Sequence, residues 1–179
     1  ALSNLKSEAA HWGERVLLVY GGGSIKRTGV YDQVMAQLAG MQVWELGGVQ
    51  PNPRLSLVRE GIRLCHEHDI QLVLAVGGGS AIDTAKAVAN GACYDGDVWD
   101  LFDGKGRNTE VLPLGTVVTI PAAGSEMSDS CVITREEDLC KRGRNTPLNF
   151  PKFSILNPEF TYTLPPFQTA CGVVDIMAH

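Results

Sequence analysis

An aspartate and a histidine stand four residues apart near the end of the chain. Asp175 and His179 lie in the mostly apolar run of residues 172–179, which we expect to be helical. Side chains at positions i and i+4 of a helix project from the same face, so this carboxylate and imidazole could share a divalent metal ion. Two ligands do not complete a metal site, and the same spacing also fits a simple side-chain pair. From the residues alone, both interpretations stay open.

Two Gly-Gly-Gly-Ser sequences could each bind a phosphate group. The first glycine loop (residues 21–24) follows an apolar run at 16–20, and the second glycine loop (residues 77–80) follows an apolar run at 72–76. Each pattern is typical of a buried strand that enters a helix through a tight turn. Glycines leave backbone N–H groups open to an anion, and a helix start adds partial positive charge. The alternative is a glycine-rich turn without a ligand, in which Ser80 simply caps the helix.

The two glycine loops compete for the pyrophosphate of a dinucleotide. An ordinary Rossmann arrangement places it on residues 21–24 and the ribose on Glu45, roughly 20 residues further on. The other arrangement places the pyrophosphate on residues 77–80 and the adenosine end on residues 21–24. Lys26 and Arg27 would then tolerate a 2′-phosphate, which favours NADP(H). Neither loop has the Gly-x-Gly-x-x-Gly pattern.

Strand and helix patterns alternate along most of the chain and define the expected fold class. We expect strands at residues 16–20, 42–46, 72–76 and 117–120, and helices at 28–39, from Pro53 to about 68, 80–90 and from about 163 to the end. This alternation predicts an α/β fold, a Rossmann-like parallel sheet with flanking helices. Right-handed crossovers place both glycine loops at the carboxyl edge of that sheet.

Two local features complete the expected architecture. Asn52 followed by Pro53 suits the cap and first position of a helix. Residues 131–134 are predicted to pair with residues 153–156 as a β-hairpin excursion, with residues 135–145 as the charged connection between them.

Composition limits the class of protein. The chain has 179 residues, 44% of them hydrophobic, and a formal net charge of −5. This is typical of a soluble globular domain, and the mildly acidic balance argues against a nucleic-acid partner. The sequence shows no membrane span or signal peptide, so we expect a cytoplasmic protein. Its five cysteines have no Cys-x-x-Cys spacing and are expected to be reduced thiols.

Four motifs in order resemble a known family. They lie at residues 21–29, 78–86, 119–126, and 161–166 together with 172–179. Their sequences and approximate spacing resemble the iron-dependent alcohol dehydrogenases, and within that family the NADPH-dependent butanol dehydrogenase branch. The resemblance covers nearly the whole chain.

The resemblance implies a role for each matching position. The pyrophosphate would lie on Gly77, Gly78, Gly79 and Ser80, supported by Asp83 and Lys86. The adenosine and its 2′-phosphate would border Gly22, Gly23, Ser24 and Asn52. The ribose and nicotinamide side would be lined by Thr119, Ser128, Lys141 and Thr163. Asp175 and His179 would be the catalytic metal ligands for iron or zinc, which would polarise a primary alcohol or aldehyde while hydride passes to or from NADP(H). The family usually has Thr at Ala123 and often Asn at Ser128, so polar contacts near the ribose are altered.

The resemblance also implies missing length. Residues 1–160 would form the dinucleotide-binding domain, and residues 161–179 would be the first helix of an otherwise absent all-helical metal-binding domain. An N-terminal strand of the family would be absent as well. We therefore expect this chain alone to be inactive, and the full-length protein to be a homodimer acting on a small alcohol or aldehyde. Two alternatives are an NAD- and zinc-dependent enzyme of the glycerol dehydrogenase type and a non-catalytic nucleotide-binding module.

Overall fold

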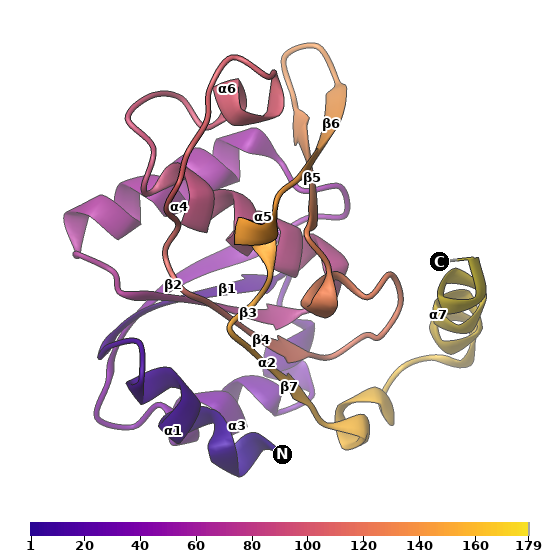
Figure 1. Ribbon diagram of the computed structural model, residues 1–179. Helices are drawn as coiled ribbons and strands as arrows, with labels where there is room; N and C mark the ends of the chain where they lie inside the picture. Colours follow the sequence, from indigo (N-terminus) through magenta and orange to yellow (C-terminus); the bar gives the residue numbers. More distant parts are fainter. Residues whose placement is uncertain (179) are drawn as a thin grey trace.

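A five-stranded parallel sheet forms the centre of the molecule (Figure 1). The computed structural model describes residues 1–178. The strands lie in the order β2-β1-β3-β4-β7. Their bounds are Arg15–Gly21 (β1), Gln42–Val49 (β2), Leu72–Gly77 (β3), Leu114–Val118 (β4) and Phe153–Leu156 (β7). The predicted parallel α/β sheet is therefore confirmed.

Helices cover both faces of this sheet. One face carries α1 (Leu5–Ala10) and α3 (Val30–Gln37), and the other carries α4 (Leu55–Glu67) and α5 (Gly79–Gly91). The shorter elements are α2 (Ser24–Arg27), α6 (Trp99–Phe102) and the 3-10 turns at Leu2–Asn4, Ser125–Met127, Pro147–Asn149 and Pro158–Thr161, and α7 (Pro166–Ala178) follows the sheet. In Figure 1, α7 stands beside the sheet rather than on it.

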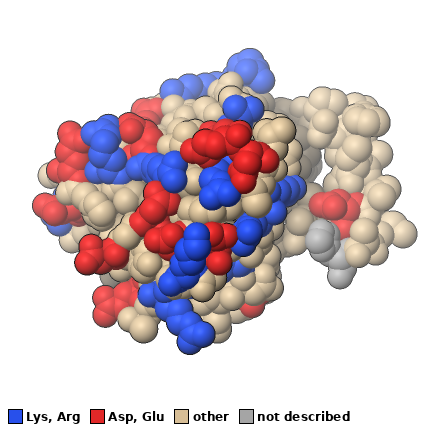
Figure 2. Space-filling view, turned by 90° about the horizontal axis from the view of Figure 1, so that it is seen from above, with Lys and Arg blue, Asp and Glu red and all other residues tan. Residues whose placement is uncertain are grey.

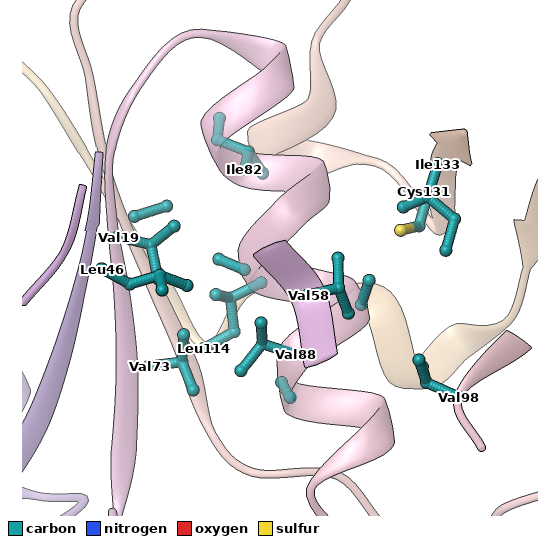
Figure 3. Close-up of a cluster of buried hydrophobic side chains, with 14 of the residues drawn as sticks. Val19, Leu46, Val58, Val73, Ile82, Val88, Val98, Leu114, Cys131 and Ile133 are labelled. Atoms are coloured by element: carbon teal, nitrogen blue, oxygen red, sulfur yellow. The ribbon is translucent and has the colours of Figure 1, made fainter. Parts of the chain in front are cut away.

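Strand side chains alternate between two hydrophobic clusters, as the period of two requires. Val19 and Val73 point toward α4 and α5, whereas Leu18 and Leu74 point toward α1 and α3. Figure 3 shows the first cluster, in which the strand residues face Val58 of α4 and the side chains of α5. Because both faces of β1 and β3 are buried, these strands are continuously apolar rather than alternating.

Helices α4 and α5 pack closely because of one glycine. A Cβ built on Gly61 of α4 would lie 2.6 Å from a methyl of Val88 on α5 and 2.8 Å from a methyl of Leu46 on β2. A larger residue at this position would push the two helices and the sheet apart. The close packing of α4 against α5 and β2 thus depends on the absence of a side chain at Gly61.

The predicted hairpin pairing was wrong. Strand β5 (Ser130–Arg135) pairs antiparallel with β6 (Cys140–Asn145), while residues 153–156 form the parallel edge strand β7 beside β4. The expected charged connection is a strand because its basic residues find partners outside the sheet. Arg142 lies 2.6 Å from the carboxylate of Asp103, and the Arg135 guanidinium lies 4.7 Å from the ring centre of Trp99.

Several predicted helix starts were also wrong. Gly78, not Ser80, occupies the cap position of α5, and Arg54, not Asn52, occupies that of α4. Asn52 instead has a positive φ of 60°, which places it in a turn. The helix expected at residues 28–39 is α3, which begins only at Val30, after Gly29 at φ 74°, and the separate turn α2 precedes it.

Three further findings concern the cysteines, the length of the helices and the surface charge. The five cysteines are free thiols in the described part of the chain, as expected. Within residues 1–178, no helix has the length and apolar character needed to cross a membrane. Figure 2 shows acidic and basic side chains interspersed over one face of the sheet domain, whereas α7 is almost free of charge on this face.

Candidate functional site

The two glycine loops meet at one end of the sheet. Strands β1 and β3 are hydrogen-bonded neighbours, with Tyr20 opposite Val76, so the loops that follow them lie side by side. A cavity of about 330 Å³ opens between them. The chain places β2 on one side of β1 and β3 on the other, which makes this a topological switch point. Open α/β sheets bind their ligands at the carboxyl ends of strands at such a point.

The second glycine loop is built for close approach of an anion. A Cβ on Gly77 would lie 2.8 Å from the Cβ of Ala81, so only glycine allows the strand to turn into α5 here. Gly79 has the opposite property, because a Cβ at this position would meet nothing within 4 Å. Gly79 and Ser80 begin a helix of 13 residues and line the cavity. The first N–H groups of a helix have no partner within it, and its dipole favours a negative charge.

The first glycine loop attracts a bound anion less strongly than the second. It leads into α2, which has only four residues, through Gly23 at φ 98°. Gly22 and Gly23 have open space where a Cβ would stand, so a flat group can approach the backbone. A single helical turn carries little of the macrodipole of a long helix. This difference supports the pyrophosphate on residues 77–80 and the adenosine end on residues 21–24.

A cluster of polar side chains lies beside the first glycine loop. The carboxylate of Glu45 accepts hydrogen bonds of 2.5 Å from both Tyr20 and Tyr31, and Lys26 donates to it at 3.3 Å. Partial burial would raise the pKa of Glu45, but these three donors outweigh it and hold the pKa below its ordinary value. The alternative prediction gave Glu45 the role of a ribose ligand. In the structure its carboxylate oxygens already accept hydrogen bonds from these three side chains. Sequence reasoning did not find Tyr20 and Tyr31.

The side chains of Asp83 and Lys86 bind the segment around residues 125–132 and do not line the first cavity. The ammonium group of fully buried Lys86 donates to the carbonyl oxygens of Ser125, Ser128 and Ser130 at 2.7 to 2.8 Å. Asp83 accepts from the Ser125 hydroxyl at 2.7 Å and from the backbone of Val132 at 3.1 Å. Burial raises the pKa of Asp83 and lowers that of Lys86. The two residues thus fasten α5 to the start of the hairpin, and their support of the pyrophosphate loop stays a prediction.

The remaining predicted cofactor residues fall into different groups. Thr119 lines both the first cavity and a second of about 270 Å³, which Thr163 and Ser24 also line. Asn52 and Lys141 line a separate cavity of about 490 Å³, where the Lys141 ammonium donates to the Asn52 side chain at 2.8 Å. Ser128 lies just before β5, where its hydroxyl accepts from the backbone N–H of Ser130.

Sequence reasoning missed one wall of the first cavity. Residues 49–51 and 120 line it beside the predicted glycines. Residues 49–51 lie in the loop expected after the second strand, and a parallel sheet brings all such loops to the same edge. That signal was present in the sequence. The position of Ile120 opposite Gly78 depends on the path of the chain after β4 and had no local signal.

The predicted metal pair is only partly visible. Asp175 lies on α7 and is partly buried, whereas His179 lies outside the described residues. Among residues 1–178, no group of three or more His, Cys, Asp or Glu side chains is placed to hold a metal ion. Helix α7 contacts the sheet domain at Gly172, where a Cβ would lie 2.9 Å from the carbonyl oxygen of Pro121.

Most of the apolar surface of α7 is uncovered. Its exposed large side chains are Phe167, Val173, Val174, Ile176 and Met177. A helix that is apolar on most sides is normally buried against other helices.

Comparison with known proteins gives consistent matches. The family model described as iron-containing alcohol dehydrogenase matches residues 1–158. A probable NADH-dependent butanol dehydrogenase 1 of Bacillus subtilis is 53% identical over 99% of this chain and 46% of its own length. The NADPH-dependent aldehyde reductase YqhD of Escherichia coli is 41% identical over 100% of this chain and 47% of its own length.

Solved structures give the same result. The NADH-dependent butanol dehydrogenase A of Thermotoga maritima superposes with a TM-score of 0.95 at 45% identity, covering 99% of this chain and 46% of that chain. The chain thus spans about half the length of the relatives it matches.

Proposed function

Because the chain belongs to the iron-containing alcohol dehydrogenase family, we propose that it is the nucleotide-binding part of an oxidoreductase. The complete enzyme would transfer a hydride between a nicotinamide dinucleotide and an alcohol and aldehyde pair. The observation that carries the proposal is the cavity between the two glycine loops at the switch point of the sheet. As proposed domains, residues 1–160 bind the dinucleotide, and residues 161–179 begin the helical part.

The residues present fit a dinucleotide. The open space at Gly22 and Gly79 admits a flat group and a phosphate against the backbone, while the tight contacts at Gly77 and Gly78 keep the second loop in place. The second loop would hold the pyrophosphate with N–H groups at the start of α5. The bound cofactor would supply hydride chemistry. This chain's own part is to bind and orient it, with its nicotinamide end directed past Thr119 and Thr163 toward α7.

The preference between NADP(H) and NAD(H) belongs to this proposal. Lys26 and Arg27 beside the first loop favour NADP(H), and one relative is named as NADPH-dependent. Other relatives, from Bacillus subtilis, are named as NADH-dependent. We propose a site that binds the 2′-phosphate form.

The described residues do not complete a metal site. Asp175 is one predicted ligand, and a catalytic zinc or iron site needs about three or more protein ligands. Bound iron or zinc would act as a Lewis acid on the substrate oxygen. Further ligands would come from the length that this chain lacks relative to its relatives. The exposed apolar surface of α7 supports a helical partner segment on this side.

A substitution at Gly79 tests the proposal in the complete natural polypeptide. Gly79→Ala adds a methyl group that meets no protein atom within 4 Å and therefore fills the proposed pyrophosphate position without disturbing the fold. NADPH titrated by its fluorescence should bind the variant about tenfold or more weakly. The matched control is Gly143→Ala on the exposed hairpin, where a Cβ has only ordinary contacts.

Three results would contradict the proposal or restrict it. Equal affinity of both variants for NADPH would remove the second glycine loop from the site. Binding of NADPH without a stoichiometric divalent metal in the complete protein would favour the non-catalytic module instead. Tight zinc binding together with a requirement for NADH would favour an enzyme of the glycerol dehydrogenase type.

A further inference from the structure

The cluster around Glu45 brings one cation and one anion together beside the first glycine loop. The Lys26 ammonium lies 3.3 Å from the Glu45 carboxylate, and it stands 4.9 Å and 4.6 Å from the ring centres of Tyr20 and Tyr31. The two rings meet edge to face at 6.0 Å. Lys26 is therefore held by a carboxylate and two aromatic faces, rather than extended freely into solvent.

Four elements must cooperate to build this cluster. Tyr20 comes from β1, Lys26 from α2, Tyr31 from α3 and Glu45 from β2. Gly47 makes room for it, because a Cβ there would lie 2.8 Å from the Tyr20 ring. Both hydroxyls donate to Glu45, so the carboxylate is fixed in one orientation. A surface ion pair without such support would be weak and mobile.

The Lys26–Glu45 pair lies close in the sequence and in space to the first glycine loop. Lys26 is two residues from Ser24 in the first glycine loop, which the proposed function assigns to the adenosine end. The side chains of Lys26 and Glu45 are still 48% and 36% exposed, so a ligand at that loop experiences both charges. Together their formal charges cancel. Arg27, the next basic residue, lines the neighbouring cavity instead.

We propose that Glu45 is the specificity-determining residue for the cofactor, because it neutralises Lys26 and weakens the attraction of the adenosine end for a 2′-phosphate. The inference rests on the proposed function in its assignment of residues 21–24. A 2′-phosphate carries a charge of about −1.5 to −2 near neutral pH, so both the attraction by Lys26 and the repulsion by Glu45 act on it. A ribose 2′-hydroxyl has no charge and is insensitive to both. Glu45 thus allows NADH to compete with NADPH despite the basic Lys26-Arg27 sequence.

The test compares two small nucleotides that differ at the ribose 2′ position. Adenosine 2′,5′-bisphosphate and adenosine 5′-monophosphate are titrated calorimetrically into the complete natural polypeptide at low ionic strength. Glu45→Gln removes the charge and keeps the shape, with the amide oxygen accepting from one tyrosine hydroxyl and the amide NH2 donating to the other. We expect it to bind the bisphosphate about 3- to 10-fold more tightly, with less than about a twofold change for the monophosphate.

Two further variants separate charge from structure. Lys26→Met should weaken binding of the bisphosphate by a similar factor and leave the affinity for the monophosphate unchanged. Glu60→Gln is the matched control, since Glu60 forms an exposed ion pair with Arg63 on α4, away from both loops. It removes the same charge without a change in either affinity. Raising the salt concentration should reduce the effect of Glu45→Gln.

The outcomes are distinguishable. Unchanged bisphosphate affinity in Glu45→Gln overturns the inference, and so does a parallel change for both nucleotides, which would indicate a structural role only. If the wild-type protein binds neither nucleotide, the proposed function fails as well. If the wild-type protein binds both nucleotides and the ratio of the two affinities is the same in all variants, only the inference about Glu45 fails.

Discussion

The ammonium group of Lys86 lies 2.8 Å from the carbonyl oxygen of Ser130, although the two residues are 44 positions apart. This contact joins the helix that follows the second glycine loop to the first residue of the hairpin. Lys86 makes similar bonds to Ser125 and Ser128, so one buried cation replaces the hydrogen bonds that this irregular segment lacks. The orientation of the glycine loop and the position of the hairpin are therefore coupled.

Removing that cation should destabilise the fold. Lys86→Met leaves one buried and two partly buried carbonyl oxygens without this donor, and we expect a loss of at least about 3 kcal/mol in the free energy of unfolding. The measurement is chemical denaturation followed by circular dichroism. Lys105→Met, at an exposed position, should change it by less than about 0.5 kcal/mol. A loss of similar size in both variants would show that the buried contacts do not matter.

Packing at Gly61 should be equally sensitive. Gly61→Ala would place a methyl group 2.6 Å from Val88, and overpacking of this kind costs about 1–3 kcal/mol. The melting temperature of Gly61→Ala, compared with that of Gly143→Ala, measures this destabilisation. If alanine at residue 61 raised the melting temperature through its higher helix propensity, the close approach of α4 and α5 would be refuted.

The direction of the dinucleotide gives a third prediction. Gly22→Ala adds a methyl beside the proposed adenosine end and should weaken the binding of adenosine 5′-monophosphate without affecting inorganic pyrophosphate. Gly79→Ala should weaken pyrophosphate. Both additions meet open space in the protein, so folding is preserved. Isothermal titration of both ligands decides the matter, and the opposite pattern would place the pyrophosphate on residues 21–24.

Thiol reactivity should separate buried from exposed cysteines. Burial raises the pKa of Cys65 to about 12, whereas partial burial raises the pKa of the more exposed Cys93 to a smaller extent. Only the thiolate reacts with a disulfide reagent, so at pH 8 Cys65 should be modified at least about a hundredfold more slowly than Cys93. Peptide mass spectrometry after timed labelling distinguishes them. Adding denaturant should abolish the difference, and equal native rates would contradict the burial of Cys65.

The pKa of Glu45 predicts how its contribution to stability depends on pH. Its pKa is lower in the folded protein, so the folded state binds fewer protons than the unfolded state. The stabilisation by Glu45 is fully present above about pH 4.3, the unfolded value, and is lost as the pH falls through the folded value. The difference in unfolding free energy between wild type and Glu45→Gln should therefore shrink on acidification. A constant difference from pH 6 to pH 3 would contradict this.

The sequence by itself determined the parallel sheet and its two glycine loops. Continuous apolar runs such as residues 72–76 are typical of a strand buried on both faces, and the glycines after them permit a tight turn. The four ordered motifs also indicated the family. These signals are local, because backbone geometry and burial act within a few residues.

Only the tertiary structure decided which partners the polar residues take. Lys86 has the spacing of a helix residue near a phosphate loop, yet its ammonium is directed at the hairpin. Glu45 has the spacing of a ribose ligand, yet two tyrosines and Lys26 occupy its oxygens. The strand at residues 140–145 was obscured by its charges, which are accommodated by Asp103 and Asn90 from distant segments. Hydrogen bonds and ion pairs join residues far apart in the chain, so neither periodicity nor spacing could predict them.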